Sequence, residues 1–372
     1  MEFRPTQEQE DVRKLATEIL DDLARPENLP DIEEAVEWYD EALWSALAKA
    51  GLLGVAVPEA YGGMGFGILE LGTLVECFGR AVAPVPALPT LVTAAETVRE
   101  FGNDEQKERL LPGVCDGSIL LGAALIDEGA VTPGETTTRA RADGNGYRLD
   151  GVKQCVEIAE RAERIVVAAT DADGHTVVCL VDPRADGVRT EAQQVTTGEK
   201  RYRLTLADAA VAAADVVADG QDGAAVLEWL LQRTLAGMVA MELGIAARAL
   251  EMTATYAGER EQFGKAIGTF QAVGQRAADA FIDVEAIRLS AWQGLWKLSR
   301  GMDARRELEI AKFWASEGGH RACYAAQHLH GGIGVDTDYP LHRYYMVSKQ
   351  LELTLGGAAE QLAARGRALA AG

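Results

Sequence analysis

The sequence predicts an α+β protein with an N-terminal α-helical domain, a middle antiparallel β-barrel domain and a C-terminal four-helix bundle. Three observations predict this fold class. Apolar residues recur every three or four positions over most of residues 1–117, as they do in amphipathic helices. Short β-type runs separated by turn sequences occupy residues 118–219. Long helical patterns fill residues 220–372, and four long helices in succession favour an antiparallel bundle.

The first domain is expected to consist of helices. Thr6 and Gln9 have the spacing of a capping box before a periodic run that ends at Leu23. Pro26 and Pro30 are expected to break this run, because proline cannot continue a helix. Further helical patterns cover Trp38–Leu53, Gly67–Ala81, Pro89–Phe101 and Asp104–Val114, and a turn-rich loop spans Val57–Gly65.

The second domain is expected to consist of short strands. The runs are Leu120–Ile126, Thr137–Ala142, Tyr147–Val156, Arg164–Thr170, Thr176–Asp182, Tyr202–Leu206 and Ala210–Val217. The sequence Asp-Gly-Asn-Gly at residues 143–146 is a strong hairpin-turn signal, and Asp173–Gly174 is another. Several short strands joined by such turns predict a barrel or a sandwich.

The third domain is expected to hold four helices, over residues 222–256, 271–299, 303–330 and 340–369. A short linker, Tyr256–Gln271, joins the first two. A guanidinium (Arg260) beside an aromatic ring (Phe263) and flexible glycines suits a phosphate or a flat ring. The alternative interpretation is a plain helix hairpin with a solvated arginine and a core phenylalanine.

Composition narrows the function classes. The chain has 372 residues, 48% of them hydrophobic, and a formal net charge of -21. Nucleic acid and anionic membrane surfaces are disfavoured as partners, because both require basic patches. No apolar run reaches the length of a membrane span. The five cysteines are scattered and odd in number, which is typical of free thiols, so we expect a cytoplasmic location.

The linker residues resemble a known signature. Arg260, Gln262, Phe263 and Gln271 lie in a segment, Arg-x-Gln-Phe-Gly-x-x-Ile-x-x-Phe-Gln, that is similar to one in flavin-dependent acyl-CoA dehydrogenases. The segment Ala50–Gly65 resembles the N-terminal domain of the same family. The resemblance implies that the arginine, phenylalanine and glutamine bind the adenine and diphosphate half of an FAD. The flavin ring of that FAD lies in the neighbouring subunit.

A second segment resembles the family near the end of the third helix. It reads Gln-His-Leu-His-Gly-Gly-Ile-Gly from residue 327, and in the family it also contacts FAD. The resemblance assigns His328, Gly331 and Gly332 to the cofactor, with histidine where the family has glutamine. His328 and His330 also have the spacing of metal ligands, but only His320 is near in sequence, so the sequence predicts no metal site.

The residue that should act as catalytic base is missing. The family removes a proton with a glutamate placed fifteen residues after a Tyr-Pro pair, and the same interval after Tyr339–Pro340 ends at Leu355. Other members carry the base on the first bundle helix, where this chain has Thr234. Neither side chain is a general base at neutral pH. Glu242 lies eight residues beyond Thr234 and is the remaining candidate.

The segments that contact the flavin ring in the family are also altered. Where the family has Thr-Glu-Pro-x-x-Gly-Ser-Asp, residues 126–133 lack the Gly-Ser-Asp. Where the family has Trp-Ile-Thr or Trp-Ile-Ser, this chain has Gln154 to Glu157. An ionised Glu157 can only accept hydrogen bonds, and its charge opposes an anionic reduced flavin.

These departures predict a half-site subunit. What is lost serves this chain's own flavin and base, and what is kept serves the FAD of an adjacent subunit. The segment Lys349–Gly357 resembles the base-less subunit of bacterial heteromeric (α2β2) dehydrogenases that act in steroid side-chain degradation. The resemblance implies a catalytic paralogue as partner in a heterotetramer, an acyl-CoA substrate and an electron-transfer flavoprotein as acceptor.

Two alternatives stay open. The chain could be a self-sufficient homo-oligomeric dehydrogenase that uses Glu242 or another acid as its base. It could also be a non-catalytic scaffold protein that retains the fold.

Overall fold

The computed structural model describes residues 4–25, 32, 38–130, 132, 134–144 and 146–370. They divide into two compact units: Met1–Glu27, Gly72–Ala83 and Leu235–Gly372 form the first, and Asn28–Leu71 and Pro84–Thr234 form the second. The three predicted domains divide the chain by sequence and stay a prediction. Some residues on which the sequence analysis relied lie outside the described residues: Pro26 and Pro30 after the first helix, Asn145 in the hairpin turn, and Val131 and Pro133 in the altered flavin segment.

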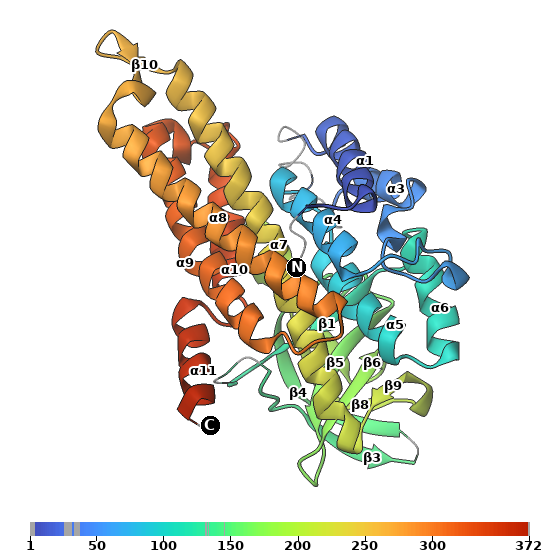
Figure 1. Ribbon diagram of the computed structural model, residues 1–372. Helices are drawn as coiled ribbons and strands as arrows, with labels where there is room; N and C mark the ends of the chain where they lie inside the picture. Colours follow the sequence, from blue (N-terminus) through green and yellow to red (C-terminus); the bar gives the residue numbers. More distant parts are fainter. Residues whose placement is uncertain are drawn as a thin grey trace. The chain divides into compact units, whose positions relative to one another are not determined.

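Helices make up most of the first unit (Figure 1). They are α1 (Gln7–Leu23), α4 (Ile68–Ala81), α7 (Gly220–Glu259), α8 (Gln271–Ser299), α9 (Arg305–His330), the 3₁₀ turns η6 (Ile267–Thr269) and η7 (Gly331–Val335), α10 (Leu341–Leu353) and α11 (Ala358–Ala370). The boundary between the units falls within α4 and again within α7. The core of the bundle is rich in alanine, which allows close helix packing, with the larger Leu243 of α7 and Ile287 of α8 between them.

Two helix boundaries in this unit test the sequence analysis. The capping box of α1 is confirmed, because Thr6 Oγ1 accepts a hydrogen bond from the backbone of Gln9 at 3.3 Å and the Gln9 side chain accepts one in return. The fourth bundle helix was predicted as one run, over residues 340–369. It is two helices, α10 and α11, because Leu355 and Gly356 have φ angles of 54° and 89°, which a helix cannot contain.

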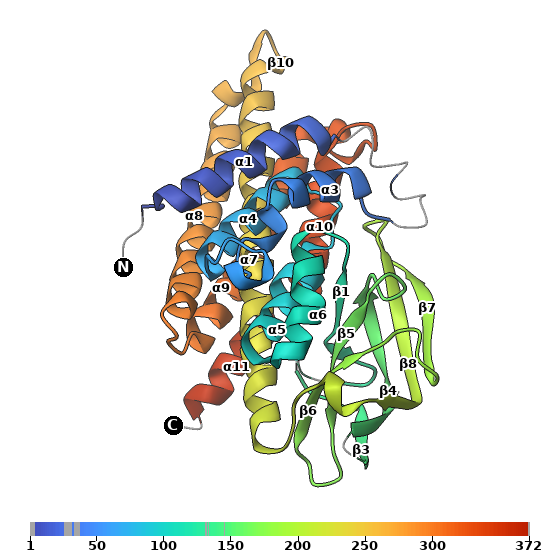
Figure 2. The ribbon, with the colours of Figure 1, turned by 90° about the vertical axis from the view of Figure 1, so that its right-hand side faces the viewer.

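The second unit combines short helices with a nine-stranded sheet (Figures 1 and 2). Its helices are α3 (Glu41–Lys49), η2 (Leu52–Gly54), η3 (Glu59–Tyr61), the π-helix η4 (Leu88–Ala95), α5 (Glu96–Phe101), α6 (Asp104–Cys115) and η5 (Ala213–Asp215). Its strands are β1 (Leu121–Ala124), β2 (Ile126–Asp127), β3 (Arg139–Asp143), β4 (Gly146–Glu157), β5 (Arg164–Thr170), β6 (Thr176–Val181), β7 (Val188–Gln194), β8 (Lys200–Val211) and β9 (Val216–Ala218).

The sheet is mainly antiparallel, in the order β7-β8-β4-β3-β5-β6-β9, with β1 on β5 and β2 on β4. The prediction of a purely antiparallel sheet needs correction, because β1 and β3 both pair with β5 in parallel. Both reach β5 through intervening strands rather than through a hairpin, so the antiparallel direction is not imposed on them.

Two strands differ from the prediction. The sequence analysis missed β7, which is an edge strand with the largely polar sequence VRTEAQQ and therefore lacks a clear apolar alternation. It also split β8 into two runs, whereas Lys200–Val211 is one strand. A bulge where β8 pairs with β4 shifts the register and disturbs the alternation that the prediction used.

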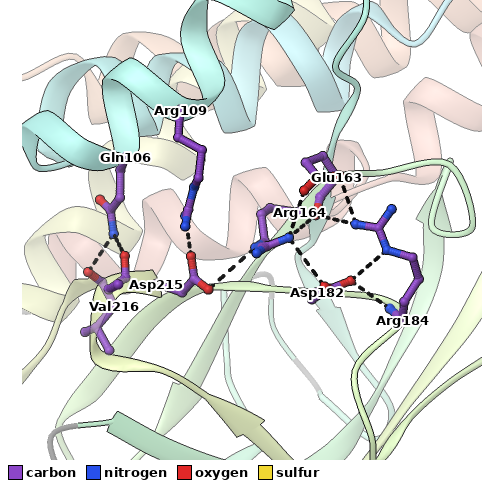
Figure 3. Close-up of polar contacts among 9 residues, drawn as sticks. Gln106, Arg109, Glu163, Arg164, Asp182, Arg184, Asp215 and Val216 are labelled. Carbon is purple, nitrogen blue, oxygen red and sulfur yellow. Dashed lines mark hydrogen bonds and ion pairs between the residues drawn. The ribbon is translucent and has the colours of Figure 1, made fainter.

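Side chains of helix α6 form hydrogen bonds and an ion pair with residues at one edge of this sheet (Figure 3). Gln106 Nε2 donates to the carbonyl oxygens of Ala214 and Val216 at 2.8 and 3.0 Å. Arg109 forms an ion pair with Asp215, and Arg164 lies 3.5 Å from the same carboxylate. These contacts fix the end of the sheet from which the chain enters α7.

No helix among the described residues combines the length and the apolar content of a membrane-crossing segment.

Candidate functional site

The linker between α7 and α8 forms a short β-hairpin that extends beyond the ends of both helices (Figures 1 and 2). Strands β10 (Glu261–Gln262) and β11 (Lys265–Ala266) pair antiparallel around the two-residue turn Phe263–Gly264. Both turn residues have positive φ angles, 56° and 76°. Such turns normally begin with Asn, Asp or Gly, because those residues adopt positive φ at little cost.

Phe263 is therefore unfavourable for this chain in two ways. A left-handed conformation costs a residue with a bulky side chain roughly 1–2 kcal/mol. The side chain is also 93% exposed, and its described ring neighbour is Phe270, at 6.2 Å between ring centroids. Backbone strain combined with an exposed aromatic ring is characteristic of residues that bind something outside their own chain.

The other predicted contacts of the hairpin are also exposed. Among the residues that the structure describes, the guanidinium of Arg260 makes no hydrogen bond or ion pair. The side-chain Nε2 of Gln262 donates to the carbonyl of its neighbour Glu261, at 2.7 Å. Gln271 is the first residue of α8, and that helix begins without a side-chain cap. The N–H groups of Val273 and Gly274 already donate to the carbonyl of Phe270, at 3.0 and 3.1 Å, so an anion at this helix end would be bound by the N–H groups that precede them.

The end of α9 lies beside the hairpin. The ring of His330 stacks on the ring of Tyr256, with centroids 4.4 Å apart, and Tyr256 lies one helical turn before Arg260. His328, Gly331 and Gly332 are exposed there. The structure thus brings the two sequence segments together at one end of the bundle, with their predicted cofactor contacts on the surface.

The sequence analysis placed Tyr256 at the start of the linker and used Tyr339 to locate the family's base, but it assigned neither residue a contact in this region. Tyr339 Oη lies 3.2 Å from His330 Nε2, and His330 Nδ1 lies 2.8 Å from the carbonyl of Ala326. Both ring nitrogens of His330 are thus already hydrogen-bonded and are not available to a metal. Tyr256 lies four residues before Arg260, and residues at this spacing are neighbours on a helix surface. This spacing could have indicated that Tyr256 lies close to the predicted cofactor contacts.

The position of the family's base is occupied by a buried hydrocarbon. Leu355 is 6% exposed and lies in the loop between α10 and α11 with a φ of 54°. Its carbonyl accepts a hydrogen bond from Gln361 Nε2 at 3.2 Å. A leucine side chain cannot remove a proton from a substrate, so this loop supplies no catalytic base.

A buried lysine holds the start of this loop. Lys312 Nζ donates to the carbonyls of Leu351 and Glu352, at 2.5 and 3.1 Å, and to Ser316 Oγ at 3.3 Å. A cation at these carbonyls also interacts favourably with the dipole of α10. Burial lowers the pKa of Lys312 to about 8, against the attraction of nearby carboxylates.

The second possible base position is a hydroxyl pair. Thr234 Oγ1 lies 2.9 Å from Thr93 Oγ1, on the π-helix η4, and also donates to the carbonyl of Leu230 at 2.8 Å. Both threonines are buried. In the described chain no carboxylate or imidazole is hydrogen-bonded to either hydroxyl, so nothing there activates them as bases.

Glu242 lies in the core of the bundle. It is 1% exposed, its Oε1 accepts a hydrogen bond from Ser348 Oγ at 2.7 Å, and its Oε2 has no partner among the described residues. A Cβ on Gly319 of α9 would approach Oε1 to 2.2 Å, so α9 closes over the carboxyl group. Burial raises the pKa of Glu242 to about 8. This enclosed position favours a structural role over proton transfer from a substrate.

The two segments that were compared with the family's flavin contacts, residues 126–133 and 154–157, contain residues that form buried ion pairs. Asp127 is held by Lys153, and it accepts hydrogen bonds at 2.7 Å from both the backbone N–H and the hydroxyl of Thr138. Lys153 Nζ also donates to the carbonyl of Ala168 at 2.6 Å. Asp127 and Lys153 are both fully enclosed, so their polar groups are used within the sheet.

Glu157 also has a partner of its own. Its carboxylate lies 2.7 Å from the guanidinium of Arg201, which also contacts Glu199 at 2.8 Å. A carboxylate at this position cannot donate a hydrogen bond to a flavin ring. The charged side chains Asp127, Lys153, Glu157 and Arg201 are therefore paired with one another within the sheet, whereas the side chains of Arg260 and Phe263 at the end of the bundle are exposed.

Comparison with known proteins shows the family to which the chain belongs. The family model "Acyl-CoA dehydrogenase, N-terminal domain" matches residues 6–118, and "Acyl-CoA dehydrogenase, C-terminal domain" matches residues 221–369. Acyl-CoA dehydrogenase FadE27 of Mycobacterium tuberculosis is 38% identical over 100% of this chain and 99% of its own length.

Two solved structures have the same fold over nearly the whole chain. One is a variant of the Tcur3481–Tcur3483 steroid ACAD, with a TM-score of 0.90, 42% identity and 98% coverage of both chains. The other is the ChsE4–ChsE5 complex from Mycobacterium tuberculosis, with a TM-score of 0.93, 38% identity and coverage of 100% of this chain and 99% of that one. The chain therefore belongs to the acyl-CoA dehydrogenase family, which comprises oxidoreductases that act on CH–CH groups.

Proposed function

We propose that this chain is the half-site subunit of a heteromeric FAD-dependent acyl-CoA dehydrogenase. It supplies the adenine and diphosphate contacts to an FAD whose flavin ring lies in a catalytic paralogue. That paralogue carries the glutamate that this chain lacks, and the assembly introduces a double bond between the α and β carbons of an acyl-CoA thioester. FAD, when bound, accepts the hydride of this desaturation.

The observation that carries the proposal is Phe263. The chain holds this residue in a strained conformation and leaves its ring in water, next to an unpaired arginine and an uncapped helix end. Among the described residues, Arg260 has no ion-pair partner and the ring of Phe263 has only the ring of Phe270 as an aromatic neighbour. These features become favourable when a flat ring and a diphosphate lie against them.

The absence of a base at Leu355 and the carboxylate at Glu157 argue that the same chain does not complete a site of its own. Two similar structures bear the names of two different chains each, and one of them is called a steroid ACAD. We therefore propose an unlike partner in a heterotetramer, a steroid side-chain CoA thioester as substrate, and an electron-transfer flavoprotein as acceptor. The five free thiols suit a cytoplasmic location.

The test is the visible absorption spectrum of the purified chain, alone and after co-expression with a glutamate-bearing paralogue. Alone it should be colourless and inactive, and the complex should contain about one FAD per unlike pair. Arg260→Ala should lower the FAD content of the complex without separating the subunits. Arg367→Ala, which changes an exposed arginine on α11, is the matched control.

Other outcomes separate the alternatives. A yellow preparation of this chain alone that is bleached by acyl-CoA, and that loses activity on Glu242→Gln, would establish the self-sufficient enzyme. An FAD content of the complex that is unaffected by Arg260→Ala would favour the scaffold protein.

A further inference from the structure

His330 is a buried ring that is held from three sides. It stacks on Tyr256 of α7 with an angle of 19° between the rings. Its Nδ1 faces the carbonyl of Ala326, one turn earlier in α9, and its Nε2 faces the hydroxyl of Tyr339, in the segment before α10. Its own carbonyl lies 3.4 Å from Tyr256 Oη, which donates to it.

These contacts fix the protonation state of the ring. A carbonyl oxygen can only accept, so Nδ1 carries the proton and donates to Ala326. Nε2 then accepts from the hydroxyl of Tyr339. Burial lowers the pKa of His330, which keeps the imidazole neutral. A neutral ring with one donor and one acceptor satisfies both neighbours without a buried charge.

The neighbours of His330 lead directly to the two predicted cofactor segments. The carbonyl of Tyr256 accepts the backbone N–H of Arg260 at 2.8 Å, so the position of the tyrosine determines where the hairpin begins. On the other side, His330 is followed by Gly331, with φ 66° and ψ -139°, a conformation that suits only glycine. The ring thus connects the root of the hairpin to the turn that holds Gly331 and Gly332.

We infer that His330 is a positioning residue that holds Arg260 and the Gly331–Gly332 turn in register, as one surface for the adenine and diphosphate half of a partner's FAD. It acts without touching the cofactor. On one side it acts through the ring of Tyr256, and on the other its ring hydrogen bonds to Ala326 and Tyr339 fix the orientation of the residue and of the peptide bond that leads to Gly331. The inference rests on the proposed function, because the surface has no purpose without that FAD.

The experiment measures the dissociation constant of FAD from the complex with the glutamate-bearing paralogue, by fluorescence titration. His330→Phe keeps a flat ring beside Tyr256 and removes both ring hydrogen bonds. We expect FAD to bind about tenfold more weakly, as for the loss of a hydrogen bond that orders a site. Assembly of the complex should stay unchanged.

A double variant distinguishes positioning from a separate contact. If His330 acts through Arg260, the variant with both His330→Phe and Arg260→Ala should bind FAD less weakly than the product of the two single effects predicts. Full multiplication of the two effects would overturn the inference. His175→Ala, a change to a histidine on the β5–β6 turn, is the control and should leave the dissociation constant unchanged.

The outcomes separate the inference from the proposed function. If Arg260→Ala weakens FAD binding and His330→Phe does not, the inference fails and the proposed function stands. If Arg260→Ala has no effect, both fail. If His330→Phe lowers the melting temperature of the isolated chain, Tyr256→Phe replaces it, because that change removes only the hydroxyl that donates to the His330 carbonyl. An unchanged FAD affinity in Tyr256→Phe would then overturn the inference.

Discussion

The buried carboxyl group of Glu242 in the bundle core is expected to make the stability of the protein depend on pH. Glu242 is enclosed by three helices with one oxygen hydrogen-bonded to Ser348 and the other unpaired. Its pKa is raised to about 8 by burial, from an ordinary value of 4.5. Between these pH values the folded chain keeps a proton that the unfolded chain releases.

The sign of the pH dependence follows from this difference. As pH rises from 4.5 to 8, the contribution of Glu242 to the free energy of unfolding falls, and above pH 8 it stays at its lowest. Each unit of pKa difference is worth about 1.4 kcal/mol. Glu242→Gln cannot titrate. Urea unfolding should therefore show little difference from the wild type at pH 5 and a variant that is more stable by a few kcal/mol at pH 9.

The control for this prediction is another glutamate of α7. Glu251 is exposed and paired with Arg80, so Glu251→Gln should lower stability by less than about 1 kcal/mol, with no gain at pH 9. A Glu242→Gln chain that is no more stable than wild type at pH 9 would show that the buried carboxyl is compensated by groups other than Ser348.

At the scale of single residues, the predicted roles stay predictions, and the surroundings of these residues could be predicted only in part. The predicted contacts Arg260, Phe263 and Gln271 all lie on the surface of one end of the bundle. The strain at Phe263 was not predictable, because a propensity argument places glycine or asparagine in such a turn and gives no reason for a phenylalanine. The enclosure of Glu242 by Gly319 depends on helix packing, which periodicity does not specify.

At the scale of the element, the sheet depends on a buried ion pair that joins β2 to β4. Asp127 and Lys153 are opposite each other in the strand register and both are enclosed. Burial raises the pKa of Asp127, but the charge of Lys153 and the donors of Thr138 outweigh it, so the pKa lies below its usual value. The carboxylate thus contributes stability at neutral pH that is lost as pH falls through its folded pKa.

Removing the charge of Asp127 should lower the free energy of unfolding strongly. Asp127→Asn leaves the ammonium of Lys153 buried without a counter-charge, which lowers the free energy of unfolding by about 3–5 kcal/mol. The same chemical change at Asp208, whose ion pair with Arg141 is exposed, should cost less than about 1 kcal/mol. Urea unfolding of the two variants provides the comparison, and equal losses would contradict the role assigned to Asp127.

Element boundaries show why the prediction of the fold was incomplete. Helix α1 was predicted with its cap, because capping is a local property of Thr6 and Gln9. Strand β7 was missed and the fourth bundle helix was not divided, because both depend on distant partners. β7 is specified by pairing with β8, and the break at Leu355 occurs where Lys312 of another helix holds the last carbonyls of α10.

At the scale of the whole molecule, the proposal predicts where a ligand stabilises the protein. A ligand that binds only the folded state raises its stability, by about 2.7 kcal/mol at a concentration one hundred times its dissociation constant. Added FAD should therefore raise the melting temperature of the complex with the paralogue and leave that of the isolated chain unchanged. Scanning calorimetry of both preparations measures this difference.

The complex that carries Arg260→Ala should show a smaller shift at the same FAD concentration, because its dissociation constant is larger. An equal FAD-dependent shift for the isolated chain would mean that it holds the cofactor without a partner.

At this scale, the division of the chain into two compact units could be predicted least well from the sequence. The sequence separates helical, strand-rich and helical segments, and the family models match the two helical ones. In the structure, α1 and most of α4 group with the later part of α7 in one unit. Close approaches allow this grouping, since a Cβ on Gly79 of α4 would lie 2.0 Å from the carbonyl of Met241. In the sequence such a contact is visible only as a glycine, and a glycine alone does not identify the residue that it contacts.

The exposed phenyl ring of Phe263 at the hairpin tip has a consequence for the lifetime of this protein in the cell. On the proposed function, the ring of Phe263 stays in water until the partner subunit binds, and a chain in that state is open to capture by chaperones and proteases. Balanced synthesis of the two polypeptides would cover the ring promptly, and surplus copies would be removed. The half-life of the chain should consequently lengthen when its counterpart is produced alongside it.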